Sequence, residues 1–341
     1  MPEAAPIPTR RLGRASLSVT VLGFGAAPLG DLYAKLDEAA AVATVEAALA
    51  GGVRLIDTSP LYGHGLSEHR VGSALRRSSA RGVVVSTKVG RVTEPFAGRG
   101  DGSGYLGGLP HALRFDYSHD GAMRSLEQSA LRLGVDAIDI ALIHDVDVWT
   151  HGADAIEARF AEAMEGAYRA LERLRAAGAV KAIGVGVNEA AMCERFARAG
   201  DFDTMLMAGR YSLLEQPALA AFMPLALEKG IGVMLGGVFN SGILATGPVP
   251  GAKYNYRPAP PGVMAKVAAI EAVCTRHGVS LRRAALQFPL GHPAVASLVM
   301  GAVSPGEVAD QIADMAAPVP AGLWADLRSE GLLAPDVPVP G

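Results

Sequence analysis

Eight short apolar runs recur along the chain, and each ends at a turn or a polar residue. The runs are almost continuously apolar rather than alternating, which is typical of parallel strands buried on both faces. They predict strands at residues 20–25, 53–59, 83–88, 138–144, 182–188, 204–210, 231–237 and 296–301. Helical patterns lie between and after them, at residues 37–50, 67–77, 117–133, 155–177, 189–199, 217–228, 263–277, 281–290 and 305–315. This alternation predicts an α/β fold, a (β/α)8 TIM barrel, with a doubly wound parallel sheet as the alternative.

The connections between these elements predict where a site would lie. The leading segment RRLGRASLSVTV has a turn at Gly13 and Arg14, which indicates an N-terminal β-hairpin that covers the bottom of the barrel. Long connections at 89–116, 145–154 and 238–262 each follow a strand, so they gather at the C-terminal face, where barrel enzymes carry their active sites. Neither a linker nor a change in composition divides the chain, so residues 1–341 are predicted to form a single domain.

Composition and charge exclude several classes of protein. The net charge is −3, from 31 Lys and Arg against 34 Asp and Glu, and no block of like charge would serve as a nucleic-acid platform. The N-terminus lacks the apolar core of a signal peptide, and no apolar run reaches ~18 residues. We therefore expect a cytoplasmic protein with no membrane partner. The two cysteines lack a metal-binding spacing and are predicted to be buried thiols, with no metal site, and the oligomeric state stays open.

Polar residues at the ends of three consecutive predicted strands carry the candidate chemistry. Asp57 and Tyr62 follow the second strand, Lys88 ends the third and His144 ends the fourth, so a barrel would bring them to one mouth. An ammonium beside a tyrosine favours the phenolate and lowers its pKa, and an aspartate keeps the lysine charged. A histidine opposite can hydrogen-bond the substrate oxygen. Such a group predicts transfer of a hydroxyl proton while a hydride leaves carbon.

Several segments together resemble the aldo-keto reductases over nearly the whole chain. They are VLGFGAAPLG, LIDTSPLYGHGLSEHRVGSAL, STK, LIHD, AIGVGVNE and RYSLL. The resemblance implies a barrel that binds a nicotinamide cofactor at its C-terminal mouth. It also implies a catalytic tetrad in which Tyr62 is the general acid and base, Lys88 tunes Tyr62, Asp57 supports Lys88, and His144 orients the substrate.

The resemblance further implies a set of cofactor-binding residues, with departures from the family pattern. Val187 stands where the family has serine, Ala208 where it has glutamine, and Gly236 where a tyrosine commonly stacks under the nicotinamide. Phe239 and Tyr211 are therefore candidates to replace that stacking. The implied set is Gly25, Asn188, Tyr211, Gly236, Val238, Phe239, Ser241, Leu244, Gly301, Glu307 and Gln311.

The segment after the last strand bears on the choice of cofactor. Relatives that prefer NADP carry basic and hydroxyl residues there, whereas this chain has Gly301, Ala302 and Glu307. A carboxylate would repel a 2′-phosphate, so we expect NAD rather than NADP, and oxidation rather than reduction. The alternative is that other basic groups reach the phosphate.

The segments HDVDVWTHG, GVFNSGIL and YNYRPAPP resemble one branch of the family, which holds D-threo-aldose 1-dehydrogenases (L-fucose dehydrogenases), L-galactose dehydrogenases and pyridoxal 4-dehydrogenases. This resemblance implies NAD-dependent oxidation of a cyclic hemiacetal to a lactone. L-fucose or a similar D-threo aldose is the expected substrate, and pyridoxal, giving 4-pyridoxolactone, is the alternative. Candidate substrate residues are His64, Trp149, Arg210, Tyr254 and Tyr256. An NADPH-dependent carbonyl reductase and a barrel that binds cofactor without turnover are the other hypotheses.

Overall fold

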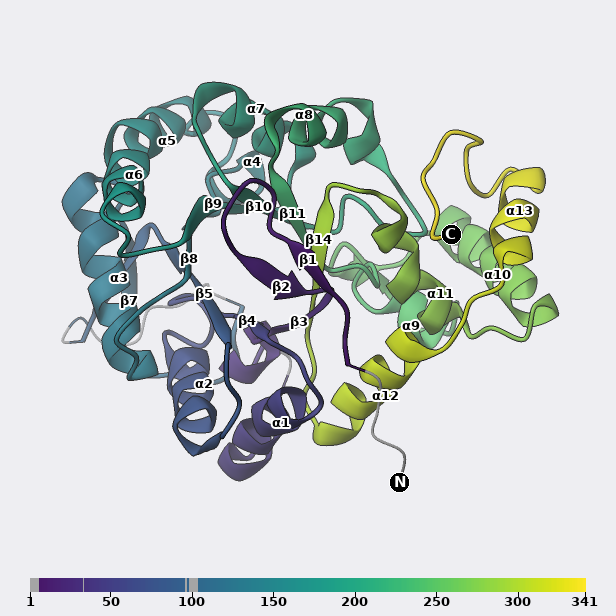
Figure 1. Ribbon diagram of the computed structural model, residues 1–341, viewed down its shortest axis with the longest axis horizontal. Helices are drawn as coiled ribbons and strands as arrows, with labels where there is room; N and C mark the ends of the chain where they lie inside the picture. Colours follow the sequence, from purple (N-terminus) through teal and green to yellow (C-terminus); the bar gives the residue numbers. More distant parts are fainter. Residues whose placement is uncertain (1–5, 33, 96, 98–103) are drawn as a thin grey trace.

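The computed structural model describes residues 6–32, 34–95, 97 and 104–341, and eight parallel strands within these residues close into a barrel (Figure 1). Neighbouring strands follow one another around the barrel in chain order, and the last pairs with the first. The strands are β3 (Leu22–Gly25), β4 (Leu55–Asp57), β5 (Val84–Val89), β8 (Ile140–His144), β9 (Ala182–Val187), β10 (Thr204–Ala208), β11 (Gly232–Gly236) and β14 (Val295–Met300). The predicted TIM barrel is confirmed, and the doubly wound alternative is wrong because β14 pairs with β3.

Helices surround the barrel and cover its outer face (Figure 1). They include α1 (Glu38–Ala50), α2 (Leu66–Arg77), α3 (His119–Leu133), α7 (Ala190–Ala199), α8 (Phe222–Lys229), α10 (Pro261–Arg276), α11 (Leu281–Gln287), α12 (Pro305–Ala316) and α13 (Ala321–Ser329). The helix predicted at 155–177 is divided into α5 (Ile156–Glu162), a π-helical turn η2 (Ala163–Ala167) and α6 (Tyr168–Ala176). Gly166 lies in that turn against the backbone of Tyr117, where a Cβ would come within 2.4 Å of the Tyr117 carbonyl oxygen.

The N-terminal hairpin closes one end of the barrel. It consists of β1 (Thr9–Arg11) and β2 (Ser18–Thr20), which pair antiparallel. Leu12 and Val19 are fully buried in one cluster with residues of the barrel interior. Gly13 adopts φ +56°, and a Cβ there would lie 2.3 Å from the Gly232 nitrogen, so only glycine fits. The hairpin predicted to cover the bottom of the barrel is thereby confirmed.

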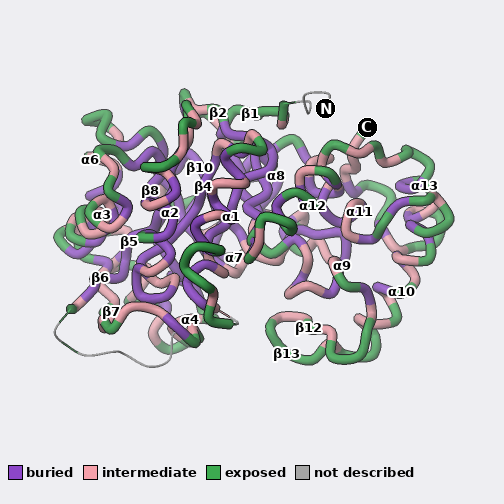
Figure 2. Tube along the Cα trace, turned by 90° about the horizontal axis from the view of Figure 1, so that it is seen from below, coloured by how far each residue is buried: buried purple, intermediate pink, exposed green. Residues whose placement is uncertain are grey.

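The long connections lie at the opposite end of the molecule (Figure 2). The first contains the hairpin β6 (Arg91–Glu94) and β7 (Ala112–Phe115), and the second contains α4 (Val148–His151). The third contains α9 (Ile243–Thr246) and the hairpin β12 (Lys253–Tyr254) and β13 (Arg257–Pro258). These segments gather at the carboxyl ends of the barrel strands, as predicted. Among the helices of the described residues, none is long and apolar enough to cross a membrane.

Candidate active site

A buried ion pair lies at the carboxyl ends of β4 and β5. Lys88 Nζ donates to Asp57 Oδ2 at 2.6 Å and to the Thr58 carbonyl oxygen at 2.8 Å. Ser86 Oγ donates to the other carboxylate oxygen of Asp57 at 2.8 Å. Lys88 is 1% exposed and Asp57 2% exposed, so water contributes little to solvating either charge. The ammonium is therefore fixed in place, with its charge compensated by Asp57.

Tyr62 lies in the turn between β4 and α2, above this pair and beside His144. The centroid of its ring is 4.7 Å from Lys88 Nζ, and its ring stands edge-on to the imidazole of His144 with centroids 6.0 Å apart. Burial raises the pKa of Tyr62 well above its usual value, and the negative charges of Asp57 and Asp145 add to the effect. In the free protein, burial therefore outweighs the lowering of the Tyr62 pKa that was expected from Lys88, and the negative charge of Asp57 opposes that lowering as well.

His144 is buried and neutral. Burial lowers the pKa of His144 well below its usual value, and the positive charges of Arg91 and Lys88 lower it further. Asp57, Tyr62, Lys88 and His144, the four residues predicted for the tetrad, thus lie together at the carboxyl ends of the barrel strands.

Residues from the connecting segments complete the surroundings, and the sequence analysis missed them. Arg91, on β6, lies between His144 and Asp145, at 3.2 Å from His144 Nδ1 and 2.8 Å from an Asp145 carboxylate oxygen. The ring of Tyr105 lies 6.2 Å from that of Tyr62. Tyr117 donates its hydroxyl to the His144 carbonyl oxygen at 2.8 Å. Arg91 and Tyr105 belong to a stretch predicted only as a connection, whose pattern gives no signal of which side chains turn inward.

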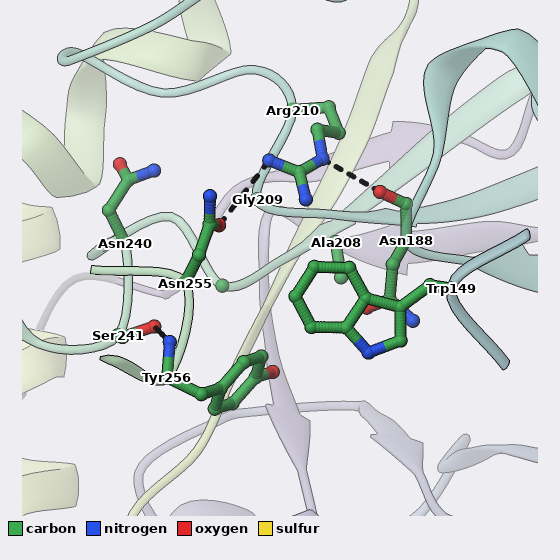
Figure 3. Close-up of a pocket in the computed structure, with 10 residues that line it drawn as sticks. Trp149, Asn188, Ala208, Gly209, Arg210, Asn240, Ser241, Asn255 and Tyr256 are labelled. Atoms are coloured by element: carbon green, nitrogen blue, oxygen red, sulfur yellow. Dashed lines mark hydrogen bonds between the residues drawn. The ribbon is translucent and has the colours of Figure 1, made fainter. Parts of the chain in front are cut away.

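A small hollow lies at the carboxyl ends of β9, β10 and β11, where the segments that follow these strands meet α4 and the hairpin of β12 and β13 (Figure 3). Ala208 and Gly236 are paired in register on β10 and β11. A Cβ added to Gly236 would lie in ordinary contact, at 3.8 Å, with the side chains of Ala208 and Leu206, so the surrounding strands do not require glycine here. Asn188 borders this hollow and the loop 237–242 closes its far side. Ala208, Gly209 and Gly237 line this hollow and give one side of it little side-chain bulk.

The loop 237–242 has the backbone of a ligand-binding turn. Gly237, Asn240, Ser241 and Gly242 all have positive φ, between 47° and 100°. Asn240 is buried, and its Oδ1 atom has no hydrogen-bond partner among the described residues. A buried polar atom without a partner is costly, so a donor supplied by a ligand fits this position. A ribose hydroxyl or an amide N–H could supply that donor, whereas a phosphate oxygen is itself an acceptor.

Other predicted cofactor residues do not reach the hollow. Tyr211 is 1% exposed and stacks on Phe288, with ring centroids 5.6 Å apart, so it is part of the core and cannot replace the missing stacking tyrosine. Val238, within the loop, and Leu244, on α9, are fully buried, whereas Phe239 is half-buried. Gly25 is buried where β3 packs against β14, and a Cβ there would come within 3.0 Å of Val299.

The three remaining cofactor candidates meet at the start of α12. Glu307 is exposed, and its carboxylate accepts from the Val303 N–H at 2.9 Å while its own N–H donates to Ser304. This reciprocal pattern is a helix-capping arrangement. Gln311 donates to the Gly301 carbonyl oxygen at 2.8 Å. Glu307 therefore has a structural role in addition to the negative charge that it places here.

The predicted substrate residues separate into two groups. Trp149 and Tyr256 are 52% and 58% exposed and line the hollow, with ring centroids 6.3 Å apart (Figure 3). Arg210 also lines it and donates to the Asn188 carbonyl oxygen at 2.7 Å. His64 is buried with its Nδ1 against the His111 carbonyl oxygen at 2.6 Å, and the Tyr254 hydroxyl donates to Glu215 at 2.8 Å. The structure therefore gives His64 and Tyr254 contacts within the protein, whereas Trp149, Arg210 and Tyr256 face the hollow.

A tyrosine lies next to a fixed ammonium and a neutral histidine. These groups can exchange a proton with a substrate oxygen while a nicotinamide exchanges a hydride with the carbon. The fold and the site thus define an oxidoreductase of the barrel class. The sequence profile of the aldo/keto reductase family matches residues 21–329, and the chain belongs to that family.

Individual relatives narrow the comparison to the predicted branch. The chain is 42% identical over 336 residues to the pyridoxal 4-dehydrogenase of Microbacterium luteolum, a match that covers 95% of this chain and 98% of that protein. It is 38% identical over 325 residues to a D-threo-aldose 1-dehydrogenase of a Pseudomonas species, covering 94% and 96%. Among solved structures, an aldo-keto reductase of Bacillus halodurans in its holo form superposes with a TM-score of 0.73 at 25% identity, over 97% of this chain and 98% of that one.

Proposed function

We propose that this protein oxidises a cyclic hemiacetal to the corresponding lactone, with NAD as the hydride acceptor. The observation that supports the proposal most directly is the placement of Tyr62 above the buried pair of Lys88 and Asp57 and beside neutral His144. Such a site can accept the proton of a substrate hydroxyl and hydrogen-bond its oxygen. Oxidation of a carbon that carries a hydroxyl group requires both.

The residues divide the work as follows. Tyr62 takes the hydroxyl proton of the substrate, and His144 donates an N–H to the hydroxyl oxygen and fixes its position. The bound oxidised nicotinamide supplies the hydride acceptor and a positive charge. Because the free protein holds Tyr62 as a neutral phenol, added positive charge at the mouth works in the direction that favours the phenolate. The buried pair of Lys88 and Asp57 is held in place beneath Tyr62, and its burial keeps water away from both charges.

The open hollow supports a ring-shaped substrate. Trp149 and Tyr256 offer two aromatic surfaces, and Arg210 and Asn255 offer a donor and an acceptor between them. An aldose of the L-fucose type and pyridoxal both close to a cyclic hemiacetal, so either presents the same reacting group. The aldose is our first candidate substrate, and the similarity to a pyridoxal dehydrogenase favours pyridoxal as the second.

The choice of NAD is supported by the charges around the start of α12. Residues 301–311 include Glu307 and Asp310 and contain neither lysine nor arginine. The nearby Arg282, on α11, is already paired with Asp310 at 3.2 Å and Asp314 at 2.6 Å. Asp310 and Asp314 are thereby compensated, and a 2′-phosphate would meet the negative charge of Glu307, which has no cationic partner among the described residues.

The test is the formation of reduced cofactor, followed by absorbance, with NAD and NADP in parallel against L-fucose, D-arabinose, L-galactose and pyridoxal. Turnover of at least one of them with NAD is expected. The variant Tyr62→Phe should lose turnover and still bind NAD, whereas Tyr168→Phe removes a hydroxyl bonded to Glu172 on the outer helices and should keep turnover. Inactivity towards all four compounds, combined with NADPH-linked reduction of simple aldehydes, would overturn the proposal.

A further inference from the structure

Arg91 is a buried charge that the tetrad does not account for. It is 7% exposed and lies on β6, at the start of the hairpin that follows β5. Its guanidinium lies 4.4 Å from the centroid of the Phe115 ring. The same group contacts His144 and Asp145 at 3.2 and 2.8 Å. Burying a guanidinium is costly unless its N–H groups and its charge have partners. The contacts with Phe115, His144 and Asp145 therefore fix its position.

The contact with His144 determines where the imidazole carries its proton. A guanidinium has N–H donors and no acceptor, so Nδ1 of His144 must present its lone pair to Arg91. Ser59 Oγ lies 3.1 Å from the same nitrogen and accepts from the Leu61 N–H, which leaves its hydroxyl hydrogen to donate to Nδ1 as well. Two donors therefore converge on Nδ1, and the proton of a neutral ring is on Nε2.

We infer that Arg91 is a positioning residue that holds His144 as the tautomer protonated on Nε2, so that this N–H is available to the substrate oxygen. The inference rests on the proposed function, because that function gives His144 its role at the oxygen. Without Arg91 the ring could turn or exchange tautomers and present a lone pair to the hydroxyl oxygen, which repels it.

Asp145 completes the arrangement. It adopts φ +56°, a left-handed conformation that aspartate tolerates better than most residues. Its N–H donates to the Gly186 carbonyl oxygen at 2.9 Å. One carboxylate oxygen pairs with Arg91. The other lies 3.3 Å from His144 Nε2 but makes no hydrogen bond with it, so Asp145 does not take up the Nε2–H. Arg91 therefore contacts both the imidazole and the carboxylate that approaches the opposite ring nitrogen.

The charged and titratable groups around His144 all bear on its protonation. Burial and the two cations oppose an imidazolium, while the Asp145 carboxylate favours it, and the net result is a neutral ring. A second proton on Nδ1 would point at the guanidinium. The groups that face His144 are Lys88 from β5, Arg91 from β6, Tyr62 from the turn after β4, and Asp145 next to it in the chain.

The first experiment reads the tautomer in the free protein, without any substrate. Histidine labelled with ¹⁵N is incorporated, and the His144 signals are assigned by their loss in His144→Gln. In the parent protein we expect an unprotonated Nδ1 and a protonated Nε2, with no titration through the neutral range. In Arg91→Met we expect both tautomers and a rise in the pKa of His144, whereas Arg91→Lys, which keeps a cationic donor, should retain the Nε2 tautomer at least in part.

The second experiment uses the substrate identified by the cofactor assay. We expect Arg91→Met to lower kcat about 100-fold through loss of orientation, with an unchanged Kd for NAD and partial rescue in Arg91→Lys. The matched control is Arg175→Met, which breaks a pair with buried Asp203 at the opposite end of the barrel and should keep kcat. An unchanged tautomer in both Arg91 variants would overturn the inference, whatever the substrate is. If Arg91→Met fails to fold, Arg91→Lys decides: a His144 protonated on Nδ1 in that variant would overturn the inference, because a cationic donor would still be present at this place.

Discussion

The buried pair of Lys88 and Asp57 allows a sharp test of what holds the floor of the site. The variant Asp57→Asn keeps the shape of the side chain and one acceptor oxygen, removes the charge, and replaces the second acceptor oxygen with an NH2 donor. Lys88 would retain its hydrogen bond to the Thr58 carbonyl oxygen at 2.8 Å. The perturbation therefore removes the ionic attraction of a pair whose atoms lie 2.6 Å apart, together with one accepted hydrogen bond.

The expected magnitude follows from the burial of both partners. Removing one member of a buried ion pair costs about 3–5 kcal/mol, because the remaining charge is left unpaired. Since Lys88 keeps its second acceptor and the asparagine oxygen can still accept, we expect the lower end, about 3 kcal/mol. That is a large share of the roughly 5–15 kcal/mol by which proteins are usually stable. Replacing both partners, in Asp57→Asn/Lys88→Met, should recover most of this loss, because no uncompensated charge remains.

Urea denaturation followed by circular dichroism measures these differences as shifts in the midpoint at constant slope. Glu157→Gln is the control, since it breaks an exposed pair with Arg195 and should change stability by less than about 1 kcal/mol. Two results would refute the reasoning. One is an Asp57→Asn protein as stable as the parent, and the other is a double variant less stable than the single one.

Three further predictions concern the reaction and its surroundings. Because the pKa of Tyr62 is raised, the phenolate fraction grows as the pH increases, so kcat/KM for oxidation should climb steadily through pH ~7 to 9, and a plateau below pH 8 would contradict it. Glu307→Arg should raise kcat/KM for NADP relative to kcat/KM for NAD about tenfold or more, and Glu307→Gln should raise it less. An unchanged preference would mean that Glu307 does not face the ribose. Gly90→Ala should lower stability by about 2 kcal/mol and should also lower kcat, because Gly90 has φ +107° and a Cβ there would lie 2.3 Å from the Tyr117 ring. Denaturation and turnover assays measure the two effects. Tyr117 would then be displaced from the His144 carbonyl oxygen, and an Ala variant with parental kcat would show that this contact is dispensable.

The barrel and the tetrad could be predicted because both follow from strands. Continuously apolar runs define buried parallel strands, and the carboxyl ends of such strands must meet at one mouth whatever the loops do. Lys88 and His144 are thus placed by their positions on β5 and β8 alone.

Side chains on the connecting segments could not be placed in this way. Asn255 and Tyr256 have φ +48° and +62°, and this left-handed turn sends Tyr256 into the hollow while Tyr254 turns back to Glu215. No local pattern distinguishes these two tyrosines. Tyr211 follows β10 as closely as a site residue would, yet it is part of the core because Phe288 from another segment packs against it.

The separation between the tetrad and the walls of the hollow bears on how such enzymes diverge. The four residues predicted for the tetrad come from β4, β5 and β8 and the turn after β4, whereas Trp149 and Tyr256 come from α4 and from the short hairpin of β12 and β13 (Figure 3). Mutations in these outer segments leave the barrel strands and their buried ion pair intact. Selection can therefore change what is bound while the proton chemistry is inherited unchanged, and one ancestral dehydrogenase could give rise to descendants for sugars and for pyridine rings.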